Sequence, residues 1–317
     1  MTTVFLQNQA DSAYAGLINE VLSEGRIKAD RTGTGTISYH GYTVRYSCKE
    51  GFPILTTKQV LYRSAIAEMI CFMRGYTNVK QFNLMGTKVW DKFADPDTGS
   101  IGDLYGRQWV NWICSGGEGG SINQLNDRLT ELRNNPFSRR LLISAWNPQF
   151  LPPEDTDPTD NPKNGLFSLA PCHHAFQLIA KPGQKNDIGK NNSPYLKRAT
   201  DEHGHFKVLD LHLSIRSNDL FLGHPFNCVG YSFLLMWISA CYGFVPGELI
   251  ISIADAHIYK DHLPQIAEQM TKSSFTAPLS QFKNIDPTPE NFFLVEPDNF
   301  ELSDYQHNAF IKGNVSK

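Results

Sequence analysis

The chain has 317 residues, of which 41% are hydrophobic, and a net charge of -3 at pH 7. This length and composition allow a substantial buried core, and the near-neutral charge gives no overall attraction to nucleic acid or to an anionic membrane. Any bound phosphate must therefore be held by a few well-placed arginines, which favours a small anionic ligand. The six cysteines have no paired spacing, and the first residues lack a basic segment followed by an apolar one. We therefore expect a cytoplasmic protein that needs neither a membrane nor nucleic acid as a partner.

Hydrophobic periodicity predicts a mixture of helices and strands within one domain. The expected helices cover residues 13–25, 62–75, 122–132 and 231–242, and the expected strands cover residues 36–46, 141–146, 175–180 and 208–215. Two polar stretches, residues 152–165 and 182–205, are rich in turn-forming residues and are expected to be loops. The pattern indicates an α+β fold over residues 1–317, in which one mixed or antiparallel β-sheet is covered by helices.

Two early segments carry residues suited to chemistry. Residues 30–36 contain two glycines among small polar side chains, which predicts a loop whose backbone N–H groups could hold phosphate together with Arg31; a plain turn is the alternative. Glu68 is the one carboxylate in the apolar helix expected over residues 62–75. Burial would raise its pKa and let it exchange protons near neutrality, although a structural partner could equally neutralise it.

Cys172 becomes a candidate nucleophile because of the arginines elsewhere in the chain. A lone cysteine is more often a small buried hydrophobe than a reactive group. A thiolate, however, forms readily beside cations and attacks electron-poor carbon, and Arg216 together with the pair Arg139 and Arg140 could lower the pKa of this thiol. The paired arginines stand just before the strand expected at residues 141–146, which is a plausible place for a phosphate clamp.

Taken together, the motifs resemble those of the thymidylate synthase family, from about residue 17 to residue 305. They occur in the family's order: Asp30-Arg31-Thr32-Gly33-Thr34-Gly35, Phe52-Pro53, Thr56-Thr57-Lys58, Glu68, Val89-Trp90-Asp91, Tyr105-Gly106-Arg107-Gln108-Trp109, Ser138-Arg139-Arg140, Ala170-Pro171-Cys172-His173, Arg216-Ser217-Asn218-Asp219, Gly223-His224-Pro225-Phe226-Asn227 and Asp255-Ala256-His257-Ile258-Tyr259. The resemblance implies the thymidylate synthase fold and a homodimer formed through the sheet.

The resemblance also implies an activity, the reductive methylation of dUMP to dTMP. The co-substrate 5,10-methylenetetrahydrofolate would supply both the one-carbon unit and the hydride, leaving dihydrofolate. Cys172 would add covalently to carbon 6 of the pyrimidine, Glu68 would manage protons through water, and Tyr105 would assist removal of the carbon 5 proton. Arg216 would bind phosphate and stabilise the thiolate. Asp219 completes the implied catalytic set.

Binding roles follow from the same resemblance. The implied dUMP site comprises Arg31, Arg139, Arg140, Arg216, Ser217, Asn218, Asp219, Asn227, His257 and Tyr259. The implied folate site comprises Trp90, Asp219, Gly223 and Ser316. Arg139 and Arg140 would reach in from the second subunit, with surface ion pairs as the alternative, and the Asn227 amide would read the uracil edge. No metal site is expected, because the histidines lack the spacing of known metal ligands.

Several positions depart from the family pattern and leave alternatives open: Leu61, Phe93, Ile215, Ala254 and the polar ending Val315-Ser316-Lys317. A polar tail that closes poorly would admit water to the last intermediate, which is the chemistry of a dUMP hydroxymethylase. A dCMP hydroxymethylase fits less well, because it carries an aspartate at the position of Asn227. A non-catalytic RNA-binding regulator would have no use for a nucleophile, an acid and a phosphate clamp together, and the chain lacks a basic stripe with interleaved aromatics.

Overall fold

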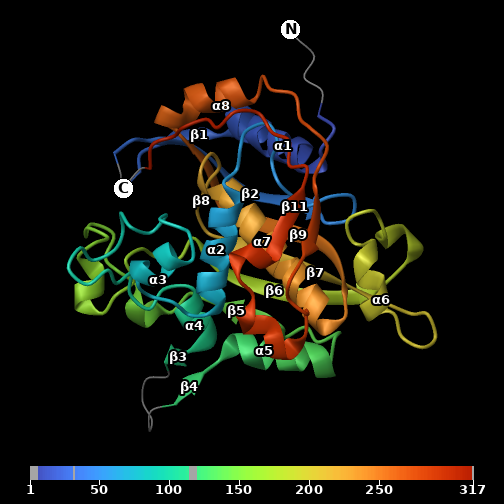
Figure 1. The fold of residues 1–317 in the computed structure, drawn as a ribbon. Helices are drawn as coiled ribbons and strands as arrows, with labels where there is room; N and C mark the ends of the chain where they lie inside the picture. The colour runs from blue at the N-terminus through green and yellow to red at the C-terminus, as the bar shows by residue number, and fades with distance from the viewer. Residues whose placement is uncertain (1–5, 31–32, 114–119, 316–317) are drawn as a thin grey trace.

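The computed structural model describes residues 6–30, 33–113 and 120–315 (Figure 1). Within these residues, a seven-stranded sheet has the order β1-β2-β9-β7-β6-β5, with β8 beside β9. Its strands are β1 (Arg26–Lys28), β2 (Thr36–Ser47), β5 (Leu142–Ser144), β6 (His173–Pro182), β7 (Lys207–Ile215), β8 (Asn218–Asp219) and β9 (Val245–Tyr259). Strands β7 and β8 run parallel to β9, and the other neighbours are antiparallel. The sheet is therefore mixed, which confirms the predicted α+β class.

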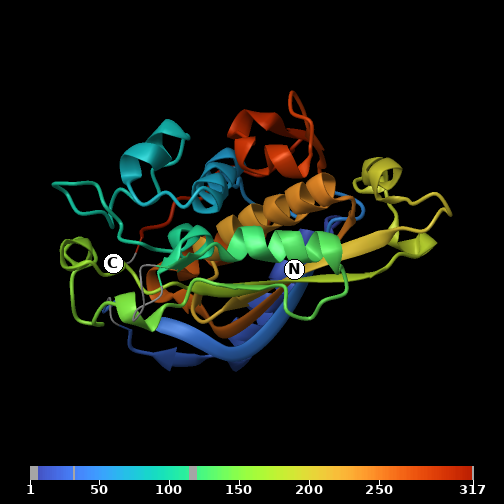
Figure 2. The ribbon, with the colours of Figure 1, turned by 90° about the horizontal axis from the view of Figure 1, so that it is seen from below.

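The helices gather on one face of this sheet. Figure 2 shows α2, α5 and α7 stacked on the same side. The α-helices in the described part of the chain are α1 (Gln9–Glu24), α2 (Tyr62–Met73), α3 (Val79–Leu84), α4 (Gly106–Val110), α5 (Gln124–Asn134), α6 (Leu196–Ala199), α7 (Gly223–Tyr242) and α8 (Leu263–Gln269). None of the helices in that part is long and apolar enough to cross a bilayer.

Helix α7 forms the centre of the core, because most of its side chains are apolar. Phe233, Leu234 and Trp237 are fully buried, and the helix packs against α2. It begins at Gly223, eight residues earlier than the periodicity predicts. Pro225 is compatible with this start because the N–H groups of a first helical turn have no partner within the helix. The motif at residues 223–227 is therefore helical.

Two other boundaries differ from the sequence prediction for identifiable reasons. Helix α1 starts at Gln9, because the Asn8 side chain accepts a hydrogen bond from the N–H of Ala10 at 2.9 Å and caps the helix. Ile122 belongs not to a helix but to a short strand, β4 (Ser121–Ile122), which pairs with β3 (Trp112–Ile113), so α5 begins only after the Asn123 cap. The elements that were not predicted include the long central strand β9 and the pair formed by β10 (Leu279–Phe282) and β11 (Phe300–Ser303).

The polar stretch at residues 182–205 is held against the sheet by buried amides. The side chain of Asn191 donates to the carbonyl of Cys48, and that of Asn192 donates to the carbonyl of Pro246, both at 3.0 Å. These bonds place the stretch against the ends of β2 and β9. Short 3-10 helices occur in this stretch and elsewhere: η1 (Pro148–Phe150), η2 (Asn161–Asn164), η3 (Lys185–Asp187), η4 (Ser193–Tyr195), η5 (Lys260–His262), η6 (Pro289–Leu294) and η7 (Pro297–Asn299).

The sheet face away from the helices keeps partly exposed polar side chains. His212 Nε2 lies 2.8 Å from the Ser252 hydroxyl, and the Thr43 hydroxyl lies 3.1 Å from the same oxygen. Arg45 of β2 pairs with Glu248 of β9 at 2.8 Å, and 57% of the arginine side chain remains exposed. This face is ordered by cross-strand contacts but is not covered by a helix in Figure 2.

Candidate active site

Cys172 lies immediately before β6, and its backbone is held from two directions. Its N–H donates to the Tyr105 hydroxyl at 2.9 Å, and its carbonyl accepts from the N–H of Arg216 at 2.9 Å. The pairing of β6 with β7 shifts register between His173 and Ala175, immediately after the cysteine. The thiol is partly exposed and is not part of a disulfide. It can therefore be reached by a small ligand while its main chain is fixed.

The guanidinium of Arg216 lies against the main chain that leads to the cysteine. Its Nε donates to the carbonyl of Pro171 at 2.9 Å, and its Nη2 donates to the carbonyl of Ala170 at 2.8 Å. The group also lies 5.6 Å from the ring centre of Trp146. These contacts use one edge of the planar fork. They place a permanent positive charge at the segment that leads to the cysteine.

Tyr105 adopts a backbone conformation that side chains seldom accept, with φ 41° and ψ -101°. Such a residue costs about 1–3 kcal/mol and persists only where its surroundings hold it. Its ring stacks on His173 at 4.0 Å and packs against Phe72 at 4.9 Å. Burial holds the pKa of the phenol well above its usual range, so the hydroxyl facing Cys172 keeps its proton at neutral pH.

Glu68, on α2, is joined to this group through Trp90. The indole Nε1 of Trp90 donates to a Glu68 carboxylate oxygen at 2.8 Å, and the indole ring lies 5.7 Å from that of Tyr105. Desolvation raises the pKa of Glu68 to about 7, and the hydrogen bond from Trp90 opposes this only partly. The structure therefore brings Glu68, Trp90, Tyr105 and Cys172 into one connected group with a carboxyl group that can hold a proton near neutrality.

Parallel pairing of β8 with β9 brings two distant motifs together. Asn218 lies opposite Ala256, and Asp219 lies opposite His257. His257 is buried, and its ring packs edge-on against that of Tyr259, with 5.2 Å between the ring centres. The two motifs that the resemblance assigns to dUMP, at residues 216–219 and 255–259, therefore share one end of the sheet.

Neighbouring residues of the first motif have different environments. Ser217 is partly exposed, whereas Asn218 is 1% exposed and its amide nitrogen lies 2.8 Å from His224 Nδ1. The other ring nitrogen of His224 lies 2.6 Å from the Tyr46 hydroxyl, and burial lowers the pKa of His224 to about 3, so this ring is neutral. Asn218 therefore supports the start of α7 from the interior of the protein. The sequence did not predict a buried position for this residue, which the resemblance assigns to the dUMP site. Asn227, on the same helix, is partly exposed.

Asp219 shapes the turn between β8 and α7. Its Oδ1 accepts from the N–H groups of Phe221 at 2.9 Å and Leu222 at 3.2 Å, and it lies 3.8 Å from His262 Nδ1. Burial alone would raise the pKa of Asp219, but His262, His257 and the backbone donors together lower it. The carboxylate is therefore ionised at the start of α7, where Gly223 is the first helical residue.

Arg139 and Arg140 are both exposed on the segment that leads into β5. Within the described ranges neither guanidinium has a carboxylate within ion-pair distance, so the alternative of surface ion pairs has no support there. Their main chain is fixed: Gln177 donates to the Arg139 carbonyl at 3.0 Å, and Arg128 donates to the Arg140 carbonyl at 3.2 Å. Two of the predicted residues, Arg31 and Ser316, lie outside the described residues.

Lys58 is a candidate that the reasoning from residue chemistry did not single out. It is 5% exposed, its ammonium donates to the Phe221 carbonyl, and it lies 3.5 Å from the centre of the Phe221 ring. Desolvation lowers its pKa to about 7, although the charge of Asp219 opposes this. In the sequence, only its position in the Thr56-Thr57-Lys58 motif indicated that Lys58 could belong to the site.

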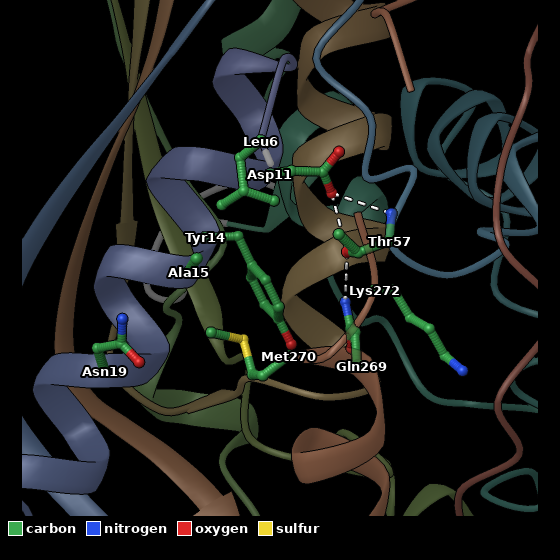
Figure 3. Close-up of a pocket in the computed structure, with 9 residues that line it drawn as sticks. All are labelled: Leu6, Asp11, Tyr14, Ala15, Asn19, Thr57, Gln269, Met270 and Lys272. Carbon is green, nitrogen blue, oxygen red and sulfur yellow. Dashed lines mark hydrogen bonds between the residues drawn. The ribbon is translucent and has the colours of Figure 1, made fainter. Parts of the chain in front are cut away.

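A pocket of about 320 Å³ lies between α1 and the end of α8 (Figure 3). In Figure 3, Asp11 and Gln269 meet at Thr57. The Asp11 carboxylate accepts from the N–H and hydroxyl groups of Thr56 and Thr57 at 2.6–3.1 Å, and Gln269 donates to the Thr57 hydroxyl at 3.1 Å. None of the predicted site residues that the structure describes lines this pocket. Its polar wall instead fixes the segment that precedes Lys58.

The arrangement combines a reachable thiol, a cation, a carboxyl group that titrates near neutrality and two facing polar motifs. In the part of the chain that the structure describes, no group of three or more His, Cys, Asp or Glu side chains could hold a metal ion. A family model described as thymidylate synthase matches residues 12–317. This span is nearly the whole chain, and the protein therefore belongs to the thymidylate synthase family of methyltransferases.

Proposed function

We propose that the protein converts dUMP to dTMP, with 5,10-methylenetetrahydrofolate as one-carbon donor and reductant and dihydrofolate as the second product. The observation that carries this proposal is the connected group of Cys172, Tyr105, Trp90 and Glu68 beside Arg216. Its parts match what the reaction needs: a nucleophile, a nearby cation and a proton carrier. Family membership supplies the substrate class.

In this proposal Cys172 begins the reaction by adding to carbon 6 of uracil. An S–C bond forms, and the electron pair of the C5–C6 double bond moves onto O4, where Glu68 supplies a proton through water. Carbon 5 can then take up the one-carbon unit and lose its proton, with the Tyr105 phenol orienting the water that removes it. The folate supplies the methylene group, and the bond from this group to the folate nitrogen breaks after the C5 proton is lost. A hydride from the resulting tetrahydrofolate then reduces the exocyclic methylene to a methyl group and leaves dihydrofolate. When the sulfur leaves carbon 6, the double bond is restored and the thiolate is regenerated.

The remaining residues would bind the substrates. Asn227 would donate to O4 and accept from N3–H of uracil, because an amide offers both functions. His257 and Tyr259 would hold the deoxyribose, and Arg216 would contact the phosphate through the edge of its guanidinium that the main-chain carbonyls leave unused. Trp90, Asp219, Gly223 and Ser316 would lie on the folate side.

The test is product analysis after incubation of purified protein with dUMP and 5,10-methylenetetrahydrofolate. Mass spectrometry of the nucleotide should give dTMP, in equal amounts with dihydrofolate measured by absorbance. Hydroxymethyl-dUMP without dihydrofolate would instead identify the hydroxymethylase alternative. Cys172→Ala should abolish turnover and retain dUMP binding, whereas Cys241→Ala, which removes a buried thiol of α7, should remain active.

We also propose that the protein acts as a homodimer in the cytoplasm. The sheet face not covered by helices is a suitable contact surface, and the exposed Arg139 and Arg140 would enter the partner's phosphate site. The thiols of Cys48, Cys71, Cys172, Cys228 and Cys241 are all unbridged, which suits a reducing compartment.

Subunit mixing tests the shared site. Cys172→Ala and the double variant Arg139→Ala/Arg140→Ala should each be inactive alone. When the two variants are mixed in equal amounts and exchange subunits, half of the dimers contain one subunit of each kind. One of the two sites in such a dimer has both the cysteine and the arginines, so about a quarter of the wild-type activity should return. No recovery after demonstrated exchange would place the arginines in their own subunit's site.

A further inference from the structure

Residues 305–314, here called the tail, are hydrogen-bonded to the body of the protein near both ends. Close to its start, the Tyr305 hydroxyl donates to the carbonyl of Leu55 at 2.8 Å. The Asn308 amide donates to the carbonyls of Thr56 at 3.0 Å and Ser273 at 2.8 Å. This part of the tail therefore rests on the same segment that Asp11 fixes, close to Lys58.

The far end of the tail is held by His262. The ring Nε2 lies 2.8 Å from the carbonyl oxygen of Asn314. Because a carbonyl oxygen can only accept, Nε2 carries a proton and donates it. His262 is 0% exposed, and its other ring nitrogen, Nδ1, lies 3.8 Å from Asp219 Oδ1. One buried imidazole thus stands between the tail and the carboxylate at the start of α7.

Gly313 allows the tail to approach this histidine closely. A Cβ atom at position 313 would lie 2.7 Å from a ring carbon of Phe221 and 3.1 Å from His262 Nε2, so any larger residue would displace the tail or these rings. The rings of Phe221 and His262 are themselves 5.0 Å apart. Phe221 also donates its N–H to Asp219, so the surface that receives the tail is continuous with the turn that Asp219 shapes.

The charges around His262 favour its protonated form. Burial alone would lower the pKa of His262, but the charge of Asp219 and the hydrogen bond to the Asn314 carbonyl raise it, and Asp261 adds to the rise. Other ionisable groups nearby include His257, which helps to lower the pKa of Asp219, and Lys58, whose pKa the charge of Asp219 raises against the effect of burial. Tyr14 and His224 also interact with the charge of Asp219, and the ring of Tyr259 packs edge-on against His262 at 5.8 Å.

We propose that His262 is a positioning residue that couples docking of the tail to the Asp219 carboxylate. Docking of the tail and ionisation of Asp219 therefore favour each other. A docked tail holds the imidazole in place beside Asp219, and an ionised Asp219 holds the imidazole in place for the carbonyl of the tail. By linkage, one coupling free energy describes both effects: the charge of Asp219 stabilises the docked tail by the same amount as the docked tail stabilises the charge of Asp219. The inference rests on the proposed function only where it concerns folate binding.

The deciding experiment is hydrogen exchange of the amides of residues 309–314 in the purified full-length protein. Asp219→Asn keeps an oxygen that can accept from Phe221 and Leu222 but loses the charge, and it should accelerate this exchange about threefold to tenfold. His262→Leu and Gly313→Ala should do the same. In the double variant, the tail amides should exchange no faster than in His262→Leu alone. His205→Gln, which removes an exposed histidine 3.6 Å from Asp201, is the control and should leave the exchange unchanged.

Tail exchange that is unchanged in Asp219→Asn, or effects of Asp219→Asn and His262→Leu that simply add, would overturn the coupling. These readouts need no turnover, so they stand even if the proposed reaction is wrong. If the reaction is right, His262→Leu and Gly313→Ala should also raise the KM for the folate about threefold to tenfold and leave the Kd for dUMP unchanged. A loosened tail with an unchanged folate KM would remove the link to folate binding.

Discussion

Replacing Glu68 by glutamine should stabilise the protein at alkaline pH while it impairs the proposed reaction. The amide keeps the shape of the side chain and an oxygen that can accept from Trp90 Nε1, as the carboxylate does at 2.8 Å. It cannot ionise and cannot deliver a proton. The variant therefore removes the titration of one partly buried group and leaves its main contact in place.

The magnitude follows from the pKa of Glu68, which desolvation raises from 4.5 to about 7. Between these values the folded protein holds a proton that the unfolded chain has released, so the free energy of unfolding falls as the pH rises from 4.5 to 7 and levels off above 7. At 1.36 kcal/mol for each pH unit, the loss due to Glu68 is at most about 3 kcal/mol. The glutamine variant should not show this loss.

Urea unfolding of both proteins between pH 5 and pH 8.5 provides the measurement. The difference in unfolding free energy, variant minus wild type, should become more positive by about 2–3 kcal/mol from pH 5 to pH 8, because other titrating groups contribute equally to both proteins. A difference that stays constant with pH would refute the raised pKa, and a negative slope would mean that the carboxylate is stabilised by an ionic partner. The variant's kcat should fall by about 10²- to 10⁴-fold.

Three further substitutions test the contacts around the thiol. Trp90→Phe removes the hydrogen bond that lowers the pKa of Glu68, so the acidic group in the pH–rate profile should titrate at a higher pH than in the wild type; a downward shift would contradict the assignment. Tyr105→Phe leaves the Cys172 N–H without its acceptor, and urea unfolding should show a loss of about 1–3 kcal/mol, whereas an unchanged stability would mean that water replaces the hydroxyl. Arg216→Lys cannot reproduce two hydrogen bonds from a planar fork, and alkylation of Cys172 at neutral pH should become slower, while a faster reaction would contradict the proposed support of the thiolate.

The sequence alone determined the type of the longer helices α1, α2, α5 and α7 and of the strands β2, β5, β6 and β7, and it supplied the candidate residues of the site. Alternation over residues 36–46 and helical spacing over residues 62–75 are local properties of the chain, and β2 and α2 match them closely. The placement of Glu68 among apolar residues already indicated a raised pKa, because burial of that helix face follows from its own periodicity. The ordered motifs were also sufficient to identify the family.

The tertiary structure decided which residues meet. Only the pairing of β8 with β9 brings Asp219 opposite His257, and only the path of the tail places the Asn314 carbonyl on His262, 52 residues away in the chain. The interior position of Asn218 likewise depends on where α7 begins. Hydrophobic patterns report which face of an element is buried, but they do not contain the register between elements. Contacts between distant segments are set by the packing of the whole chain.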